Sequence, residues 1–171
     1  MYLQPTTEEL KIERDIFMYR SYIAQHKYNT AKNEIDDSSP SELQPLKLLA
    51  QYFSEKDERD TILEQLEKNK NDAGAKGHSY RLVAAMIFYQ EDNLEDALRV
   101  LHKSDDIECS ALRVQIFLKM NRVDLAEKEV KTMQDKDDDA TLTQLALAFV
   151  NLSLGGEKYE EAFYIFQVYF K

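Results

Sequence analysis

Glycine and proline are scarce in this chain, which has four glycines and three prolines among its 171 residues. An average sequence contains about 12% of the two together. Tight turns depend on these residues, and β-hairpins depend on them most. Apolar residues meanwhile recur at spacings of three and four along almost the whole chain, which is the period of one helix face. The sequence therefore predicts an all-α fold and argues against a β-sandwich or β-barrel.

Short polar breaks divide this pattern into ten segments. Ser38 to Ser41 form one break, Gly74 and Gly77 lie in the longest, and Gly155–Gly156 form another, as expected where helices end. The breaks between paired segments are short, so each pair is expected to form an antiparallel hairpin. The predicted helices cover residues 8–25, 27–36, 42–54, 57–69, 77–90, 93–103, 108–120, 122–134, 138–153 and 157–170.

A small residue recurs in the second helix of the hairpins, where it would allow close approach to the first helix. The span from Ala31 to Ala162 is four steps of roughly 33 residues, near the 34 of a tetratricopeptide repeat. Accidental repetition is the alternative, and Ser153 stands where the last unit should have an aromatic residue. We predict one domain, residues 1–171, folded as an α-solenoid of antiparallel helical hairpins, a tetratricopeptide-like superhelix. The repeat positions are Ala31, Ala97, Ala126 and Ala162, and Ile62 fills the skipped unit. The aromatic residues nine positions earlier are Tyr22, Phe53, Phe88 and Phe117. The large apolar residues four positions later are Ile35, Leu66, Leu101, Val130 and Phe166.

Composition and charge exclude several classes of protein. Hydrophobic residues make up 43% and charged residues 32%, which fits a water-soluble globular chain, and the apolar runs are far shorter than the ~20 residues that span a bilayer. A net charge of -10 disfavours nucleic acid, whose binding depends on clustered Lys and Arg. An acidic surface would allow a basic partner, although it more often serves solubility. The first residues lack the order of a signal peptide, so we expect a cytoplasmic protein.

Catalytic and metal-binding patterns are missing from the sequence. The three histidines, His26, His78 and His102, are far apart along the chain, and Cys109 is the one cysteine. An EF-hand beginning at Asp135 would need Gly at its sixth position and Glu at its twelfth, but both are alanine. The acidic run is expected instead to cap a helix that begins near Ala140. We therefore expect no enzyme, no metal and no cofactor.

The first helix of each hairpin lines the inner face of a tetratricopeptide array, so the repeat register selects a candidate protein-binding surface. This surface mixes apolar and hydrogen-bonding side chains, which suits an extended or hairpin segment of another protein. The alternative is an adaptor that binds chaperone or other peptide termini. The surface lacks the dense array of Lys, Asn and Arg that such an adaptor uses to bind a C-terminal carboxylate, which argues against this alternative. The selected residues are Arg20, Ile23, Lys47, Gln51, Met86, Tyr89, Gln115 and Leu118.

Four stretches of the chain resemble the coatomer epsilon subunit family. The most specific begins at Gln134 and reads QDKDDDATLTQLALAFVNLSLGGEKYEEAFYIFQ. It combines an acidic loop, a TLTQLA helix, a Gly-Gly-Glu-Lys turn and an aromatic helix. The others are ERDIFMYRSYIAQ from Glu13, LQPLKLLAQY from Leu43 and ALRVQIFLKMNRVDLAEKEVKTMQ from Ala111. The resemblance covers nearly the whole chain and corresponds to the N-terminal half of family members, which implies a fragment of a longer chain.

The resemblance implies a non-enzymatic scaffold subunit of the COPI vesicle coat. Its implied partner is the C-terminal domain of the coatomer alpha subunit, with indirect contacts to the other coatomer subunits. The implied locations are the cytoplasm, the cytoplasmic side of Golgi membranes through peripheral association, and COPI-coated vesicles. The implied process is Golgi-to-ER retrograde and intra-Golgi transport. The resemblance implies no catalytic or cofactor-binding residue.

Overall fold

The computed structural model describes residues 7–73, 76–102 and 104–169, and these residues form ten α-helices and two short 3-10 helices. The chain divides into two compact units, 1–100 and 101–171. The all-α fold class is confirmed, and neighbouring helices pack on one another within each unit, from α1 to α5 and from α7 to α10, as they do in an α-solenoid. The single domain over residues 1–171 stays a prediction. Within the described ranges, no helix has the length and apolar character needed to cross a membrane.

The first unit contains three helical pairs. Helix α3 lies at its centre and contacts α1, α2, α4 and α5. The short helices η1 and η2 extend α4 at its two ends, as a turn of 3-10 helix often does. The elements are α1 (Glu8–Ala24), α2 (Tyr28–Glu34), α3 (Gln44–Ser54), η1 (Lys56–Glu58), α4 (Arg59–Asn69), η2 (Lys70–Asp72), α5 (His78–Gln90) and α6 (Leu94–Leu101).

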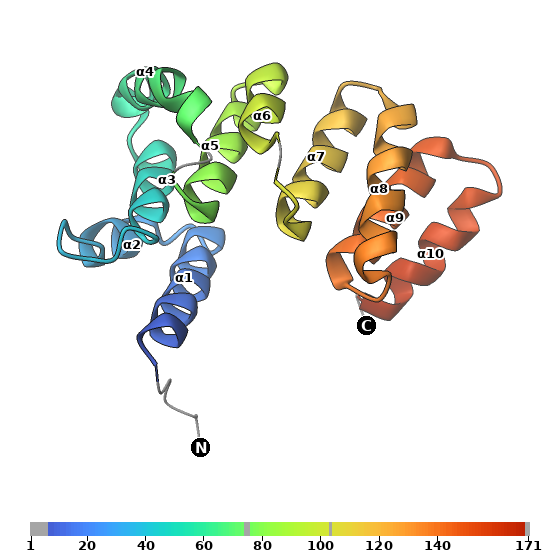
Figure 1. The fold of residues 1–171 in the computed structure, drawn as a ribbon, viewed down its shortest axis with the longest axis horizontal. Helices are drawn as coiled ribbons and strands as arrows, with labels where there is room; N and C mark the ends of the chain where they lie inside the picture. Colours follow the sequence, from blue (N-terminus) through green and yellow to red (C-terminus); the bar gives the residue numbers. More distant parts are fainter. Residues whose placement is uncertain (1–6, 74–75, 103, 170–171) are drawn as a thin grey trace. The chain divides into compact units, whose positions relative to one another are not determined.

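The second unit contains four helices, and each packs against its neighbour in the chain. Helix α9 contacts both α7 and α8 and also carries α10 (Figure 1). The core lies between α7, α8 and α9, where Val114, Val130, Met133 and Val150 are buried together. The helices are α7 (Ile107–Lys119), α8 (Val123–Asp137), α9 (Thr141–Leu154) and α10 (Lys158–Tyr169).

The repeat register predicted which residues are buried. Each of the four register alanines has no exposed surface, and Ile62 in the skipped unit is 4% exposed. The large apolar residues four positions later are buried as well in four of the five units, and Phe166 is partly buried. A methyl side chain at the first position therefore lets two helices approach, and the larger residue one turn later fills the adjacent space.

Three hairpin turns share one backbone geometry. His26, Asp92 and Asn121 have φ of 59°, 61° and 57°, in the left-handed region. In each turn the residue at positive φ donates its N–H to the carbonyl three residues back, and the next residue donates to the carbonyl five residues back. This is the Schellman motif that ends many helices. The carbonyl five residues back belongs to Tyr22, Phe88 or Phe117, so these three register aromatics mark where α1, α5 and α7 end.

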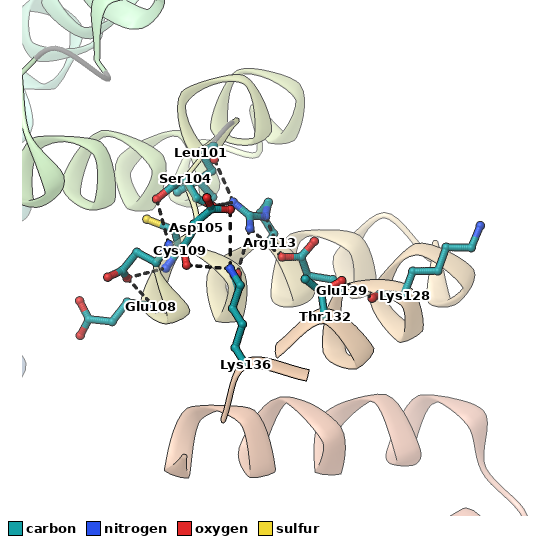
Figure 2. Close-up of polar contacts among 12 residues, drawn as sticks. Leu101, Ser104, Asp105, Glu108, Cys109, Arg113, Lys128, Glu129, Thr132 and Lys136 are labelled. Atoms are coloured by element: carbon teal, nitrogen blue, oxygen red, sulfur yellow. Dashed lines mark hydrogen bonds and ion pairs between the residues drawn. The ribbon is translucent and has the colours of Figure 1, made fainter. Parts of the chain in front are cut away.

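Arg113 of α7 ties the segment before α7 to α8 (Figure 2). Its Nε and Nη2 donate to Glu129 Oε1 at 3.0 and 2.7 Å. Its Nη1 donates to the carbonyls of Leu101 and Ser104 at 2.9 and 3.0 Å, and Nη2 also donates to Ser110 Oγ at 2.9 Å. The guanidinium thus uses its whole donor set, and within the second unit it joins the carbonyls of Leu101 and Ser104 to Glu129 of α8.

The acidic run does not cap the next helix, so the capping interpretation was wrong, although that helix does begin next to Ala140. Helix α8 continues to Asp137, beyond the predicted end at residue 134, and α9 begins at Thr141 rather than 138. Ala140 is the N-cap of α9 and makes no side-chain cap. Gln144 instead donates its amide to the carbonyl of Asp138 at 2.6 Å. Asp costs less than about 1 kcal/mol per residue inside a helix and Lys is a good helix former, so α8 can continue through Asp135 and Lys136 to Asp137.

Candidate protein-binding site

A groove of about 740 Å³ opens in the first unit beside α3. Its walls come from the loop before α3, from α3 and α4, and from the start of α5. Lys47 and Gln51 lie in this groove, one turn apart on the same face of α3. Its volume is in the range of ligand-binding clefts, about 300–1000 Å³. The lining residues are Asp37, Ser41, Gln44, Pro45, Lys47, Leu48, Gln51, Gln65, Lys76 and Tyr80.

The loop wall of the groove is ordered by local hydrogen bonds. Gln44 donates its side-chain amide to the carbonyls of Asp36 and Ser39 at 2.7 and 3.3 Å. Asp36 accepts hydrogen bonds from the backbone and hydroxyl of Ser38 and from the hydroxyl of Ser39, and these bonds lower the pKa of its carboxyl. The loop is therefore fixed against α3 before any partner binds.

The charged groups of the groove are only loosely paired within the chain. The Lys47 ammonium lies 3.7 Å from the carboxylate of Asp37, whose side chain is fully exposed. The Lys76 ammonium lies 4.8 Å from the centre of the Tyr80 ring, which is a cation–π contact. Burial raises the pKa of the Tyr80 hydroxyl, so this group stays protonated at neutral pH and can donate a hydrogen bond.

The groove suits a polar ligand better than a metal ion. Among the lining residues that the structure describes, Asp37 is the one carboxylate, and none is histidine or cysteine. Calcium needs several oxygen ligands, and zinc is held by Cys, His or several carboxylates. The lining instead offers amides, hydroxyls and ammonium groups, which bind through hydrogen bonds and charge.

The other candidate residues of the first unit lie on α1 and α5. Arg20 and Tyr89 are partly buried, and Met86 is 38% exposed. Ile23 is only 8% exposed, so its side chain packs inside the unit and offers little surface to a partner. None of these four residues lines the groove. The repeat register thus selected two residues that line the groove, Lys47 and Gln51. The other candidates of the first unit lie outside the groove, on α1 and α5.

Gln115 and Leu118 belong to the second unit. Gln115 is exposed on α7. Leu118 is partly buried and packs against the core that α7, α8 and α9 share. Gln115 is therefore free to meet a partner, whereas Leu118 also contributes to the stability of the unit.

Sequence reasoning selected two of the ten described residues that line the groove and missed the rest. Gln65 lies on α4, a second helix, and the register assigns second helices to the outer side. Tyr80 lies in the first turn of α5, two turns before the candidate residues of that helix. A polar residue at the start of a first helix is a signal that could have identified Tyr80. Only the packing of α3, α4 and α5 brings Gln65 into the same groove as Gln51, so sequence spacing alone could not have predicted it.

The stacked hairpins and the groove beside α3 define a helical-repeat protein, a class whose extended faces commonly bind other chains. The chain belongs to the coatomer epsilon subunit family, whose model matches residues 1–169.

Curated relatives from plants and from an amoeba match most of the chain. Coatomer subunit epsilon-1 of Arabidopsis thaliana is 40% identical over 162 residues, which are 94% of this chain and 56% of the relative. Coatomer subunit epsilon-1 of Oryza sativa subsp. japonica is 43% identical over 155 residues, 91% of this chain and 54% of the relative. Coatomer subunit epsilon of Dictyostelium discoideum is 36% identical over 167 residues, 94% of this chain and 56% of the relative. The chain thus spans about half the length of the curated relatives it matches.

Proposed function

We propose that this chain is a non-enzymatic scaffold subunit of the COPI coat that binds the C-terminal domain of the coatomer alpha subunit. The family match over residues 1–169 is the observation that carries this proposal. The hairpin fold supports it, because first helices with exposed polar and apolar side chains suit a segment of another protein. Contacts with other coatomer subunits are indirect, through the alpha subunit.

The proposed location follows from the coat. The chain works in the cytoplasm and reaches the cytoplasmic side of Golgi membranes and COPI-coated vesicles as a peripheral component. Its proposed process is Golgi-to-ER retrograde and intra-Golgi transport. A scaffold needs no catalytic centre, and the groove offers hydrogen-bond donors rather than a nucleophile with its base.

The test is isothermal titration of the purified C-terminal domain of the alpha subunit against this chain and its variants. Met86→Ala and Tyr89→Ala on α5 are expected to weaken binding, each by about 2 kcal/mol if these residues anchor the partner. Glu95→Lys on α6 and Lys128→Glu on α8 are the controls, because both are exposed on second helices. These controls should change the affinity much less.

Two results would contradict the proposal. Absence of binding between the wild-type chain and the alpha-subunit domain would remove the function itself. Equal losses in the α5 variants and in the controls would place the interface elsewhere. Micromolar binding of a chaperone C-terminal peptide in a parallel fluorescence titration would favour the adaptor alternative. Circular dichroism of each variant must show unchanged helix content.

A further inference from the structure

Three polar side chains in the groove have no hydrogen-bond partner among the described residues. They are the amides of Gln51 and Gln65 and the hydroxyl of Tyr80, which come from α3, α4 and α5 and line the same groove. A side-chain amide both donates and accepts, as a peptide group does. An extended chain presents unpaired N–H and C=O groups along its length. The groove can therefore hold such a chain by its backbone.

The groove also has a local charge opposite to that of the chain. The chain carries a net charge of -10, yet the described lining has two lysines, Lys47 and Lys76, and one carboxylate, Asp37. The Lys47–Asp37 pair is long, at 3.7 Å, and its carboxylate is fully exposed. Exposed pairs of this kind contribute little to stability, so an incoming carboxylate can replace Asp37 at little cost.

Lys47 is held in place before binding. Its side chain is 25% exposed, so most of its stem packs along α3 while the ammonium reaches the groove. Lys76 is oriented by the ring of Tyr80 at 4.8 Å. A binding group that is already oriented loses less conformational entropy when a ligand arrives. The two ammonium groups are thus positioned to select for charge as well as shape.

We propose that the groove between α3, α4 and α5 binds an extended, acidic segment of a partner protein. The segment lies with its backbone on Gln51, Gln65 and Tyr80, and its carboxylates meet Lys47 and Lys76. This inference rests on the proposed function in taking the partner to be a protein, and it names the chemistry that the partner must present. Complementary charge supplies specificity and speeds association.

The test uses labelled ten-residue peptides and fluorescence anisotropy with the 171-residue chain at about 50 mM salt, where charge effects are weakly screened. Three peptides alternate threonine with glutamate, with glutamine or with lysine. The glutamate peptide is expected to bind at least fivefold more tightly than the glutamine peptide, and the lysine peptide more weakly still. The K47Q/K76Q double variant should lose about tenfold in affinity for the glutamate peptide and little for the glutamine peptide.

Matched variants separate the contribution of the lysine charges from that of the hydrogen bonds to the peptide backbone. K68Q is the charge control, because Lys68 is on α4 with a side chain 77% exposed and does not line the groove; it should leave binding unchanged. The Q51A/Q65A double variant should weaken the glutamate and glutamine peptides by the same factor, since it removes contacts to the backbone. Circular dichroism checks that each variant is folded.

Four outcomes would overturn the inference. Equal affinity for the glutamate and glutamine peptides would remove the role of charge, and an equal loss in K68Q would show that any lysine suffices. Tighter binding of a labelled single-stranded oligonucleotide than of the glutamate peptide would assign the groove to another polymer. If K47Q/K76Q bound the alpha-subunit domain with unchanged affinity, the groove would be rejected as the binding site, and the proposed function would stand. Failure of the wild-type chain to bind that domain would instead reject the proposed function.

Discussion

Single polar residues join neighbouring segments of this chain through several hydrogen bonds each. Arg113 joins two carbonyls, a hydroxyl and a carboxylate in the second unit (Figure 2). Asp96 accepts hydrogen bonds from Lys70, Asn93 and Arg99 in the first unit. Both groups are mostly buried, where a polar atom that loses its partner costs more than the hydrogen bond itself contributes. Substitutions at these residues should therefore destabilise the fold beyond the loss of one contact.

Replacing Arg113 is expected to lower the free energy of unfolding. Arg113→Met keeps much of the side-chain stem but leaves the carboxylate of Glu129, at 18% exposure, without its donors. We expect a loss of about 2–3 kcal/mol, as for hydrogen bonds to charged groups. Urea unfolding followed by circular dichroism measures it. Lys128→Met, at an exposed position of α8, is the control, and an equal effect of the two substitutions would show that Arg113 has no special role.

Asp96 should make stability depend on pH. Burial alone would raise the pKa of its carboxyl, but hydrogen bonds from Lys70 and Asn93 and the charges of Lys70 and Arg99 lower it below the ordinary value of 3.8. Because the native pKa is lowered, ionised Asp96 stabilises the fold above pH 3.8, and this contribution is lost as the pH falls from there through the native pKa.

The variant Asp96→Asn tests this pH dependence. We expect it to be less stable than the wild type at pH 7 by about 1.5–3 kcal/mol, and the difference should narrow at about pH 3. Urea midpoints at the two pH values give the comparison. Asp60→Asn, at an exposed position of α4, should leave the urea midpoint unchanged at both pH values. A difference between Asp96→Asn and wild type that stays constant with pH would contradict the assignment.

At the scale of helices, the turn residues decide where each hairpin folds back. The Asn121 turn has φ of 57°, a conformation that costs most L-residues about 1–2 kcal/mol. Asparagine tolerates it, and glycine adopts it freely. The expected effect of Asn121→Val is therefore a destabilisation of about 1–2 kcal/mol, whereas Asn121→Gly should be nearly neutral.

Thermal unfolding of these variants checks the turn. Met120→Val is the matched control, because Met120 lies next to Asn121 and has an ordinary φ of -77°. We expect this substitution to lower the melting temperature less than Asn121→Val does. If Asn121→Val and Met120→Val were equally stable, the left-handed turn would not limit the stability of the hairpin.

The helices could be predicted from the sequence because their signals are local. Apolar spacing and the alanine register report which face of each helix is buried, and the four alanines are fully buried as expected. The end of α8 was misplaced because an acidic run neither stops nor starts a helix by itself. Lys47 and Gln51 were selected from the register, but their groove partner Gln65 depends on how α4 packs beside α3. Such tertiary proximity leaves no periodic mark in the sequence.

At the scale of the whole molecule, the apolar surface is unevenly distributed. On α10, which packs against α9, Tyr159, Phe163, Tyr164 and Val168 are 55–69% exposed. Capping repeats of solenoids usually present a polar outer face, so the exposed face of α10 differs from a cap. Contiguous exposed apolar groups of this kind promote association with another surface.

We therefore expect the 171-residue chain to self-associate through α10 as its concentration rises. Sedimentation velocity over a range of concentrations should show a rising average sedimentation coefficient. The double variant F163Q/V168Q should shift the association to higher concentration, because it removes apolar area without touching the contact of Ala162 with the core.

Phe17→Gln on α1 is the matched control, since Phe17 is 56% exposed but lies in the other unit. It removes an exposed aromatic ring of the same kind, so a general loss of stickiness would appear in both variants. An effect confined to F163Q/V168Q would assign the association to α10. A wild-type chain that sediments as a monomer at every concentration would contradict the prediction, and would mean that the aromatic face of α10 is tolerated in water without a second copy to cover it.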